Sequence, residues 1–147
     1  MNKFMEQAIA IKDDIVEYRR VIHSNPEVGA ELPKTKAYVM DKLREFGYEP
    51  EEICESGIVA TIEGSKPGKT FLLRADMDAL PMAEATDCDF KATNGAMHSC
   101  GHDMHTAMLL GAAKLLRQNQ DEIEGTVKLV FQPDEEGFTG AKAMIEA

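Results

Sequence analysis

Apolar residues in the first part of the chain recur at helical spacing. Between residues 5 and 22 they repeat roughly every three to four positions, which places them on one face of a helix. They are Met5, Ala8, Ile9, Ile11, Ile15, Val16 and Val21. Asn25 precedes Pro26, and the residue before a proline disfavours helical backbone, so we expect this helix to end there. A second helix is predicted over residues 34–47, where helical spacing returns and Gly47 is a typical stop.

The following segments change to the pattern of strands. "GIVATIEG" at 57–64 and "KTFLLRADM" at 69–77 are short β-branched or wholly apolar runs bounded by glycine and proline. They predict adjacent strands, which a hairpin across "EGSKPGK" would join. "GTVKLVFQP" at 125–133 predicts a further strand that stops at Pro133.

Two more helices are predicted on either side of that last strand. A polar loop over residues 83–97 leads to a helix over 106–118, and "TGAKAMIEA" at 139–147 opens another. The helix over 106–118 has a stripe of residues that we expect to be buried: Met108, Leu109, Ala112, Leu115 and Leu116. Helices that alternate with strands favour one α/β domain, with helices layered on a mixed, largely parallel sheet.

The charged motifs follow predicted strands. "RADMDALP" comes after "FLL", and "PDEEG" comes after "VKLVFQ". In open α/β sheets ligands bind at the carboxyl ends of the strands. The arrangement therefore predicts a site at this edge.

Composition narrows the classes of partner. The 147 residues include 16 basic and 26 acidic side chains, for a formal net charge of −10, and Lys and Arg form no cluster. A nucleic-acid partner is therefore poorly supported. The first residues mix acids and bases and contain neither a signal peptide's apolar stretch nor a membrane span, so we expect a cytoplasmic protein without a membrane partner. Cys54, Cys88 and Cys100 form no C-x-x-C pair, which argues against a disulfide framework.

The stretch "HSCGHD" is the first candidate for chemistry. Cys100 and His102 can reach one ion because Gly101 between them allows a tight backbone turn. A thiolate with an imidazole suits zinc or a similar transition metal. The alternative is a polar loop at a helix start.

Two adjacent acids in "QPDEEG" form the second candidate. Glu135 and Glu136 would repel each other at a strand end unless something positive offsets their charge. With a divalent cation, one carboxylate can ligate while the other takes a proton from water. The alternative is a solvated acidic turn, which Asp134 would also suit.

The strand ending in "RADMD" is the third candidate. Asp76 and Asp78 could supply a further ligand, or a carboxylate that holds a ligand histidine in its useful tautomer. We favour the supporting role, because Arg74 points to the same face and partly neutralises the acids. The alternative is a paired surface cluster.

Three residues near the predicted helix start are harder to assign. His98 and His105 could each be a ligand, a supporting hydrogen bonder or a bystander. We expect His105 at or near the N-cap, where Asp103 could instead cap the exposed amides. His23, with Glu27 and Glu31, could border the same cleft, although the sequence does not connect it to a metal.

Four stretches together carry a family resemblance. They are "RRVIHSNPEVGAE", "LLRADMDALPM", "MHSCGHDMHTAMLLGAAKLL" and "VKLVFQPDEEGFTGAKAMIEA". In this order they resemble the metallo-aminoacylase and carboxypeptidase superfamily, specifically its amidohydrolase branch of hippurate hydrolases, auxin-conjugate hydrolases and N-acyl-amino-acid deacetylases. The resemblance runs from about Tyr18 to the last residue and implies a zinc-peptidase-like catalytic domain.

The resemblance also implies roles and an activity. Cys100, His102 and Glu136 would bind metal, Glu135 would be the general base and later the proton donor, and Asp78 would support a ligand. The cofactors would be divalent ions, zinc, manganese, nickel or cobalt, with two in the intact enzyme. The substrate would be a small-molecule N-acyl amino acid, hydrolysed to a carboxylic acid and a free amino acid. The alternatives are a dipeptidase or desuccinylase of the same superfamily, or a non-catalytic metal-binding module.

Family members are considerably longer than this chain. They carry a smaller inserted α/β domain that usually makes the dimer contact, and two further histidine ligands downstream of "QPDEEG". The resemblance thus implies that residues 1–147 are the N-terminal part of a catalytic domain, truncated, and that the intact protein is a homo-oligomer. We expect the fragment alone to be inactive.

Overall fold

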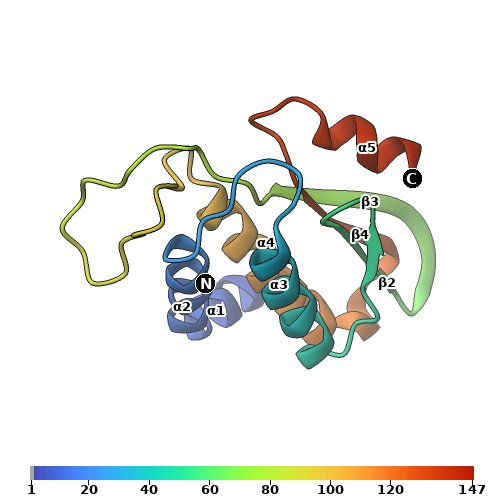
Figure 1. Cartoon of the computed structure of the whole chain (residues 1–147). Helices are drawn as coiled ribbons and strands as arrows, with labels where there is room; N and C mark the ends of the chain where they lie inside the picture. Colours follow the sequence, from blue (N-terminus) through green and yellow to red (C-terminus); the bar gives the residue numbers. More distant parts are fainter. Residues whose placement is uncertain (1) are drawn as a thin grey trace.

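A computed structural model describes residues 2–147 and shows helices packed on a mixed four-stranded sheet (Figure 1). The predicted α/β class is thereby confirmed. In chain order the elements are α1 (Lys3–Ala10), α2 (Lys12–His23), α3 (Pro33–Glu45), β1 (Glu51–Ile53), β2 (Gly57–Glu63), β3 (Lys66–Asp76), α4 (His102–Gln118), a 3₁₀ turn (Gln120–Glu122), β4 (Glu124–Gln132) and α5 (Gly140–Glu146).

The sheet has the strand order β1-β2-β4-β3. β3 and β4 run parallel, whereas β4 pairs with β2, and β2 with β1, in antiparallel fashion. β4 therefore lies between β2 and β3, and the predicted hairpin of adjacent strands is wrong. β2 and β3 are close in sequence, but they pair with β4 and not with each other, and no local sequence pattern indicates this order.

The predicted helix over residues 5–22 is two helices. α1 ends at Ala10, and Ile11 has φ −99° and ψ 12°, outside the helical region. The change of direction places Ile11 in the core at 9% exposure, but leaves Met5 and Ile9 on α1 55% and 54% exposed. One continuous helix could not bury Ile11 and the apolar face of α2 against the same neighbour.

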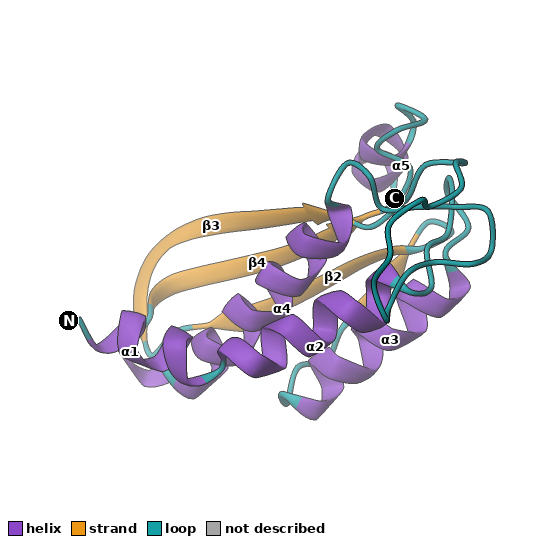
Figure 2. Cartoon of the chain, turned by 90° about the vertical axis from the view of Figure 1, so that its left-hand side faces the viewer, coloured by secondary structure: helices purple, strands orange, loops and turns teal. Residues whose placement is uncertain are grey.

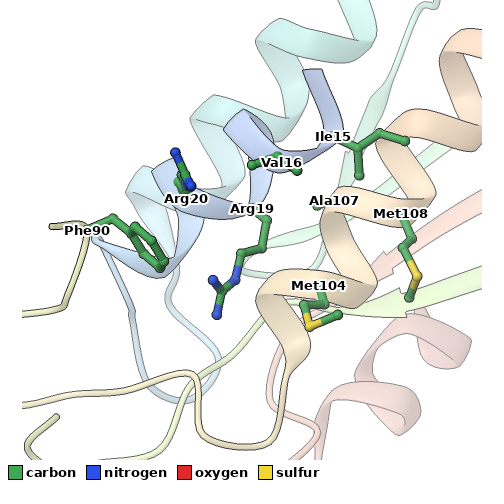
Figure 3. A pocket seen from close by; sticks show the side chains of 8 residues that line it. All are labelled: Ile15, Val16, Arg19, Arg20, Phe90, Met104, Ala107 and Met108. Atoms are coloured by element: carbon green, nitrogen blue, oxygen red, sulfur yellow. The ribbon is translucent and has the colours of Figure 1, made fainter. Parts of the chain in front are cut away.

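The core lies between the sheet and α2, α3 and α4, which share one side of it (Figure 2). Alternate residues of β2 and β4 face these helices and pair across the strands, including Ile58 with Phe131 and Ala60 with Leu129. Of the stripe predicted on α4, Leu109 is buried but Met108 is 52% exposed. Met108 instead lines a surface groove of about 340 Å³ between α2 and α4 (Figure 3).

On the opposite side of the sheet, α5 covers part of the strands. α5 lies near the carboxyl ends of β3 and β4 (Figure 2), and its side chains Met144 and Ile145 line a pocket with Val130 and Leu72. β3 is an edge strand, and its Phe71 and Leu72 are 58% and 60% exposed. Among the described residues 2–147, no helix combines the length and apolarity that a membrane span requires.

Candidate metal centre

The loops after β3 and β4 leave the sheet at the same edge. Asp76 ends β3, and its register partner Gln132 ends β4. The backbone N–H of Met77 donates to the carbonyl oxygen of Gln132 at 2.9 Å, which extends the contact into the loop. The parallel pairing therefore brings Asp76 and Asp78 toward the turn that carries Glu135 and Glu136, at the sheet edge where the sequence places a site.

Three potential ligands converge beside this edge. One ligand atom from each of Cys100, His102 and Glu136 lies within 4.8 Å of the other two. Sulfur, imidazole nitrogen and carboxylate oxygen suit zinc or another transition metal, which binds such atoms at about 2.0–2.3 Å. Glu136 Oε1 is buried without a hydrogen-bond partner, which is costly unless a cation or a donor reaches it. The three side chains thus fit a divalent ion.

The charges around Cys100 also favour a cation. The pKa of its thiol is raised, first by contact with the Glu136 carboxylate, then by partial burial and by the charges of Glu135 and Asp76. Carboxylates hold a thiol in its protonated form because a thiolate would repel them. A divalent ion reverses this effect, since it attracts thiolate and carboxylates together.

Asp78 connects two of the three ligands. Its backbone carbonyl oxygen lies 2.9 Å from His102 Nδ1, and its side-chain Oδ2 accepts from the Glu136 backbone N–H at 3.0 Å. A carbonyl oxygen only accepts, so Nδ1 of His102 carries a hydrogen, while Nε2 faces Glu136 Oε1 at 3.9 Å. Asp78 is 1% exposed, and it therefore fixes the tautomer of one ligand and the main chain of another.

Glu135 stands on the solvent side of these groups. Its Oε2 lies 3.7 Å from His102 Nε2, and its side chain is 38% exposed. Asp134, just before it, has φ 51° in the left-handed region, which is uncommon for a residue other than glycine. The Asp134 carboxylate accepts from the Thr139 hydroxyl, and its N–H donates to the Gly29 carbonyl oxygen at 3.2 Å. This turn leaves the Glu135 side chain more exposed to solvent than that of Glu136, whose Oε1 is buried.

Asp76 contacts a different set of partners. Its Oδ1 lies 2.5 Å from His105 Nδ1, and its Oδ2 accepts from Arg74 at 3.0 Å. Burial would raise the pKa of Asp76, but the bond to His105 and the charges of His102 and Arg74 lower it overall. Asp76, His102 and His105 also lie close enough to hold an ion. The engagement of both Asp76 oxygens favours the supporting role.

The helix that carries these residues starts earlier than the sequence suggests. α4 begins at His102 and not at Thr106, so His105 lies inside the first turn and not at the N-cap. The N-cap is Gly101, with φ 88° and no side-chain cap. Asp103 does not cap the helix amides, because its carboxylate is turned toward side chains of α2. A glycine in the left-handed conformation starts the helix here, and such a start has no side-chain signature.

His98 is buried away from the three ligands. It is 4% exposed, and neither ring nitrogen has a hydrogen-bond partner. Burial lowers the pKa of His98 to about 4, so the ring is neutral near neutral pH. It does not join either group of potential metal ligands found among residues 2–147.

His23 borders a second polar cluster and not the metal ligands. Its Nδ1 lies 2.8 Å from Asp103 Oδ2, and its Nε2 lies 3.0 Å from Glu84 Oε1. Glu27, which we expected near it, accepts instead from the backbone N–H of Thr35 at 2.8 Å, at the start of α3. The N-terminus of a helix favours such a carboxylate.

Arg19 and Glu84 belong to this cluster but carry no signal in the sequence. Glu84 lies in a polar loop without periodicity, and Arg19 is one of several charged residues on an amphipathic helix. Their partners are far away along the chain, so only the fold brings them together.

The chain is similar to several proteins that are named as hydrolases. The chain is 49% identical to thermostable carboxypeptidase 2 of Saccharolobus solfataricus, over 100% of its own length and 39% of the relative's. It is 41% identical to an N-acyl-L-amino acid amidohydrolase of Geobacillus stearothermophilus, over 93% of its length and 38% of the relative's. The chain thus spans well under half the length of the curated relatives it matches.

A solved structure and a family model give the same assignment. The YXEP protein of Bacillus subtilis, a dinuclear metal-binding peptidase of the M20 family, superposes with a TM-score of 0.89 at 37% identity, over 93% of this chain and 39% of that one. The model for peptidase family M20/M25/M40 matches residues 72–147, which contain the three ligands and Glu135. The chain belongs to peptidase family M20/M25/M40.

Proposed function

We propose that this chain carries the metal-binding, water-activating part of an amidohydrolase that cleaves N-acyl amino acids. The observation that carries the proposal is the convergence of Cys100, His102 and Glu136 within 4.8 Å, with Glu135 Oε2 3.7 Å from His102 Nε2. The names of relatives, among them an N-acyl-L-amino acid amidohydrolase and a hippurate hydrolase, support the substrate class.

Cys100, His102 and Glu136 would hold one divalent ion, and the whole enzyme would hold two, as the Bacillus subtilis peptidase does. Zinc, manganese, nickel and cobalt all accept this donor set. Such an ion polarises an amide carbonyl and makes a water molecule more acidic. Proton transfer and support of the ligands would fall to Glu135 and Asp78.

Glu135 would move the proton. Within residues 2–147 its exposed carboxylate forms no ion pair with Lys or Arg, and it would take a proton from the attacking water at Oε2. It would then deliver that proton to the nitrogen of the departing amino acid, which leaves as the amine. Asp78 would keep the ligands in place, through its carbonyl oxygen on His102 and its carboxylate on the Glu136 amide.

A carboxypeptidase or dipeptidase activity is the second candidate, because a relative 49% identical to the chain is a carboxypeptidase. A peptide is an amino acid acylated by another residue, so the same ligands and base serve both reactions. The difference would lie in the acyl pocket.

The test begins with metal analysis of the purified chain, followed by assays of the whole protein that contains it with N-acetyl and N-benzoyl amino acids and with dipeptides. Turnover that disappears in Glu135→Gln while the metal content stays the same supports the proposal. Faster turnover of dipeptides would favour the second candidate. Metal without turnover would favour a non-catalytic metal-binding module, and a chain that binds no ion would contradict the metal centre itself.

A further inference from the structure

Asp103 is a buried acid directly beside a metal ligand. It follows His102 in the first turn of α4 and is 0% exposed. Its Oδ2 accepts from Arg19 Nε at 2.6 Å and lies 2.8 Å from His23 Nδ1. Arg19 and His23 are one helical turn apart on α2, so both reach the same oxygen from one face of that helix. Figure 3 shows Arg19 extending from α2 toward this turn, where Met104 marks its outer side.

His23 also contacts the loop that precedes Cys100 and His102 in the chain. Its Nε2 lies 3.0 Å from Glu84 Oε1, and the other Glu84 oxygen accepts from the Ala92 backbone N–H at 2.6 Å. Both ring nitrogens of His23 thus face carboxylate oxygens, and Arg19 Nη2 lies 3.3 Å from His23 Nδ1. Asp103, His23, Glu84 and Arg19 therefore form one connected polar cluster.

This polar cluster joins α2 and α4 at a cost in free energy. Burying charges costs free energy even when they are paired, whereas apolar contacts join helices without that cost. α2 and α4 use apolar contacts farther along: Ile15 packs against Gly111 so closely that an added Cβ would lie 2.7 Å from Ile15 Cδ1. The buried charges are confined to the end of α4 that carries His102.

The start of α4 is attached on two sides, and toward β3 His105 Nδ1 lies 2.5 Å from Asp76 Oδ1 and the Thr106 hydroxyl donates to the Asp76 carbonyl oxygen at 2.9 Å. Gly101 is the N-cap without a side-chain cap, and Cys100 is exposed in the turn before it. On one side, the carbonyl oxygen of Asp78 holds the His102 ring. On the other side, Asp103 holds the helix backbone to α2. The Cys100 and His102 ligands lie between these two attachments.

We propose that Asp103 is a positioning residue for the metal ligands: held by Arg19 and His23, with Glu84 behind His23, it fixes the first turn of α4 so that Cys100 and His102 meet Glu136 around one ion. The inference rests on the proposed metal centre and adds to it a set of residues that touch neither the ion nor the substrate.

The test compares three isosteric variants of the chain. Asp103→Asn removes the central charge, and Glu84→Gln removes the charge behind His23. The matched control is Asp14→Asn, because Asp14 accepts from Lys114 at 2.7 Å and also joins α2 to α4, but at a distance from the ligands. Each variant is titrated with Co²⁺ while its sulfur-to-cobalt charge-transfer band is recorded, and its folding is checked by circular dichroism and denaturation.

We expect Asp103→Asn to bind Co²⁺ about tenfold more weakly, the lower end of what outer-shell changes cost metal sites, with a shifted or weakened charge-transfer band. Glu84→Gln should change both quantities in the same direction by less, and Asp14→Asn should match the wild type. A purely structural role would lower stability and leave the affinity and band of the folded protein unchanged.

Wild-type affinity and band in folded Asp103→Asn and Glu84→Gln would overturn the proposal. If Asp103→Asn does not fold, Glu84→Gln decides the question alone. Equal losses in Asp14→Asn would also overturn it, because general docking of α2 on α4 would then be sufficient. Failure of the wild-type chain to bind Co²⁺ would instead count against the proposed metal centre.

Discussion

The backbone carbonyl oxygen of Asp78 lies 2.9 Å from Nδ1 of His102, and this contact leaves Nε2 as the atom that can bind a metal. The Asp78 side chain meanwhile accepts from the Glu136 amide. Asp78 therefore contacts two of the three potential ligands, one through its main chain and one through its carboxylate.

The first prediction separates these two contacts. Asp78→Ala keeps the carbonyl oxygen on His102 but removes the acceptor for the Glu136 amide, so metal affinity should fall by ~10–100-fold. Asp78→Asn keeps an oxygen that can accept from that amide and should lose less. Competition with a chelator measures both, and an unchanged affinity in Asp78→Ala would contradict this role of the side chain.

The second prediction concerns the left-handed start of α4. Gly101 has φ 88°, and a Cβ added there would meet nothing within 4 Å, so Gly101→Ala adds backbone strain alone. We expect a loss of about 1–2 kcal/mol in the free energy of unfolding, together with weaker metal binding. Gly95 has φ 84° and equally open surroundings, so Gly95→Ala is the control. It should lose similar stability and keep its metal affinity; weaker binding there as well would remove the special role of Gly101.

The third prediction is a pH dependence. Burial opposes the charged form of Glu84, but hydrogen bonds from His23, Thr86 and the Ala92 amide lower its pKa from 4.5 to about 2. A lowered pKa means that the unfolded chain binds the proton first as the solution is acidified. Glu84 thus stabilises the fold above a pH of about 4.5, and this contribution is lost as the pH falls toward about 2.

Thermal denaturation of the wild type and of Glu84→Gln measures this contribution. The wild type should have the higher melting temperature near neutral pH, and the difference should shrink as the pH falls through that range. A difference that stays constant with pH would show that the charge of Glu84 is not the cause.

The fourth prediction tests which side of the sheet holds the core. Leu129, in the centre of β4, is 0% exposed, so Leu129→Ala should cost about 2–5 kcal/mol of stability. Leu72 on the edge strand β3 is 60% exposed, and Leu72→Ala should change stability by no more than about 0.5 kcal/mol. Chemical denaturation of both variants checks the pair, and similar losses would mean that the open side of the sheet is covered.

The candidate site could be predicted from the sequence because its motifs follow strands. Asp76 and Glu136 come after β3 and β4, and parallel strands bring their carboxyl ends to one edge. Cys100 and His102 are separated only by Gly101, so a tight turn there is enough to bring their side chains together. The family resemblance then joined these motifs into one set of ligands.

The parts that could not be predicted depend on contacts between distant segments. No local pattern states that β4 lies between β2 and β3, or that the predicted first helix breaks at Ile11. The contact between His23 and Glu84 could not be predicted either, because no sequence motif contains both residues. Helical spacing predicts Met108 in the core, because spacing alone does not tell which side of α4 is left open beside α2.

The arrangement of the ligands couples ion binding to folding. Cys100 and His102 lie at the start of α4, and Glu136 follows β4, so in the unfolded chain a long flexible segment separates the first two ligands from the third. A bound ion would close that segment into a loop and would bind the native chain far better than the unfolded one. Thermal stability should accordingly rise with the concentration of free ion, and a chelator should shorten the lifetime of the native state.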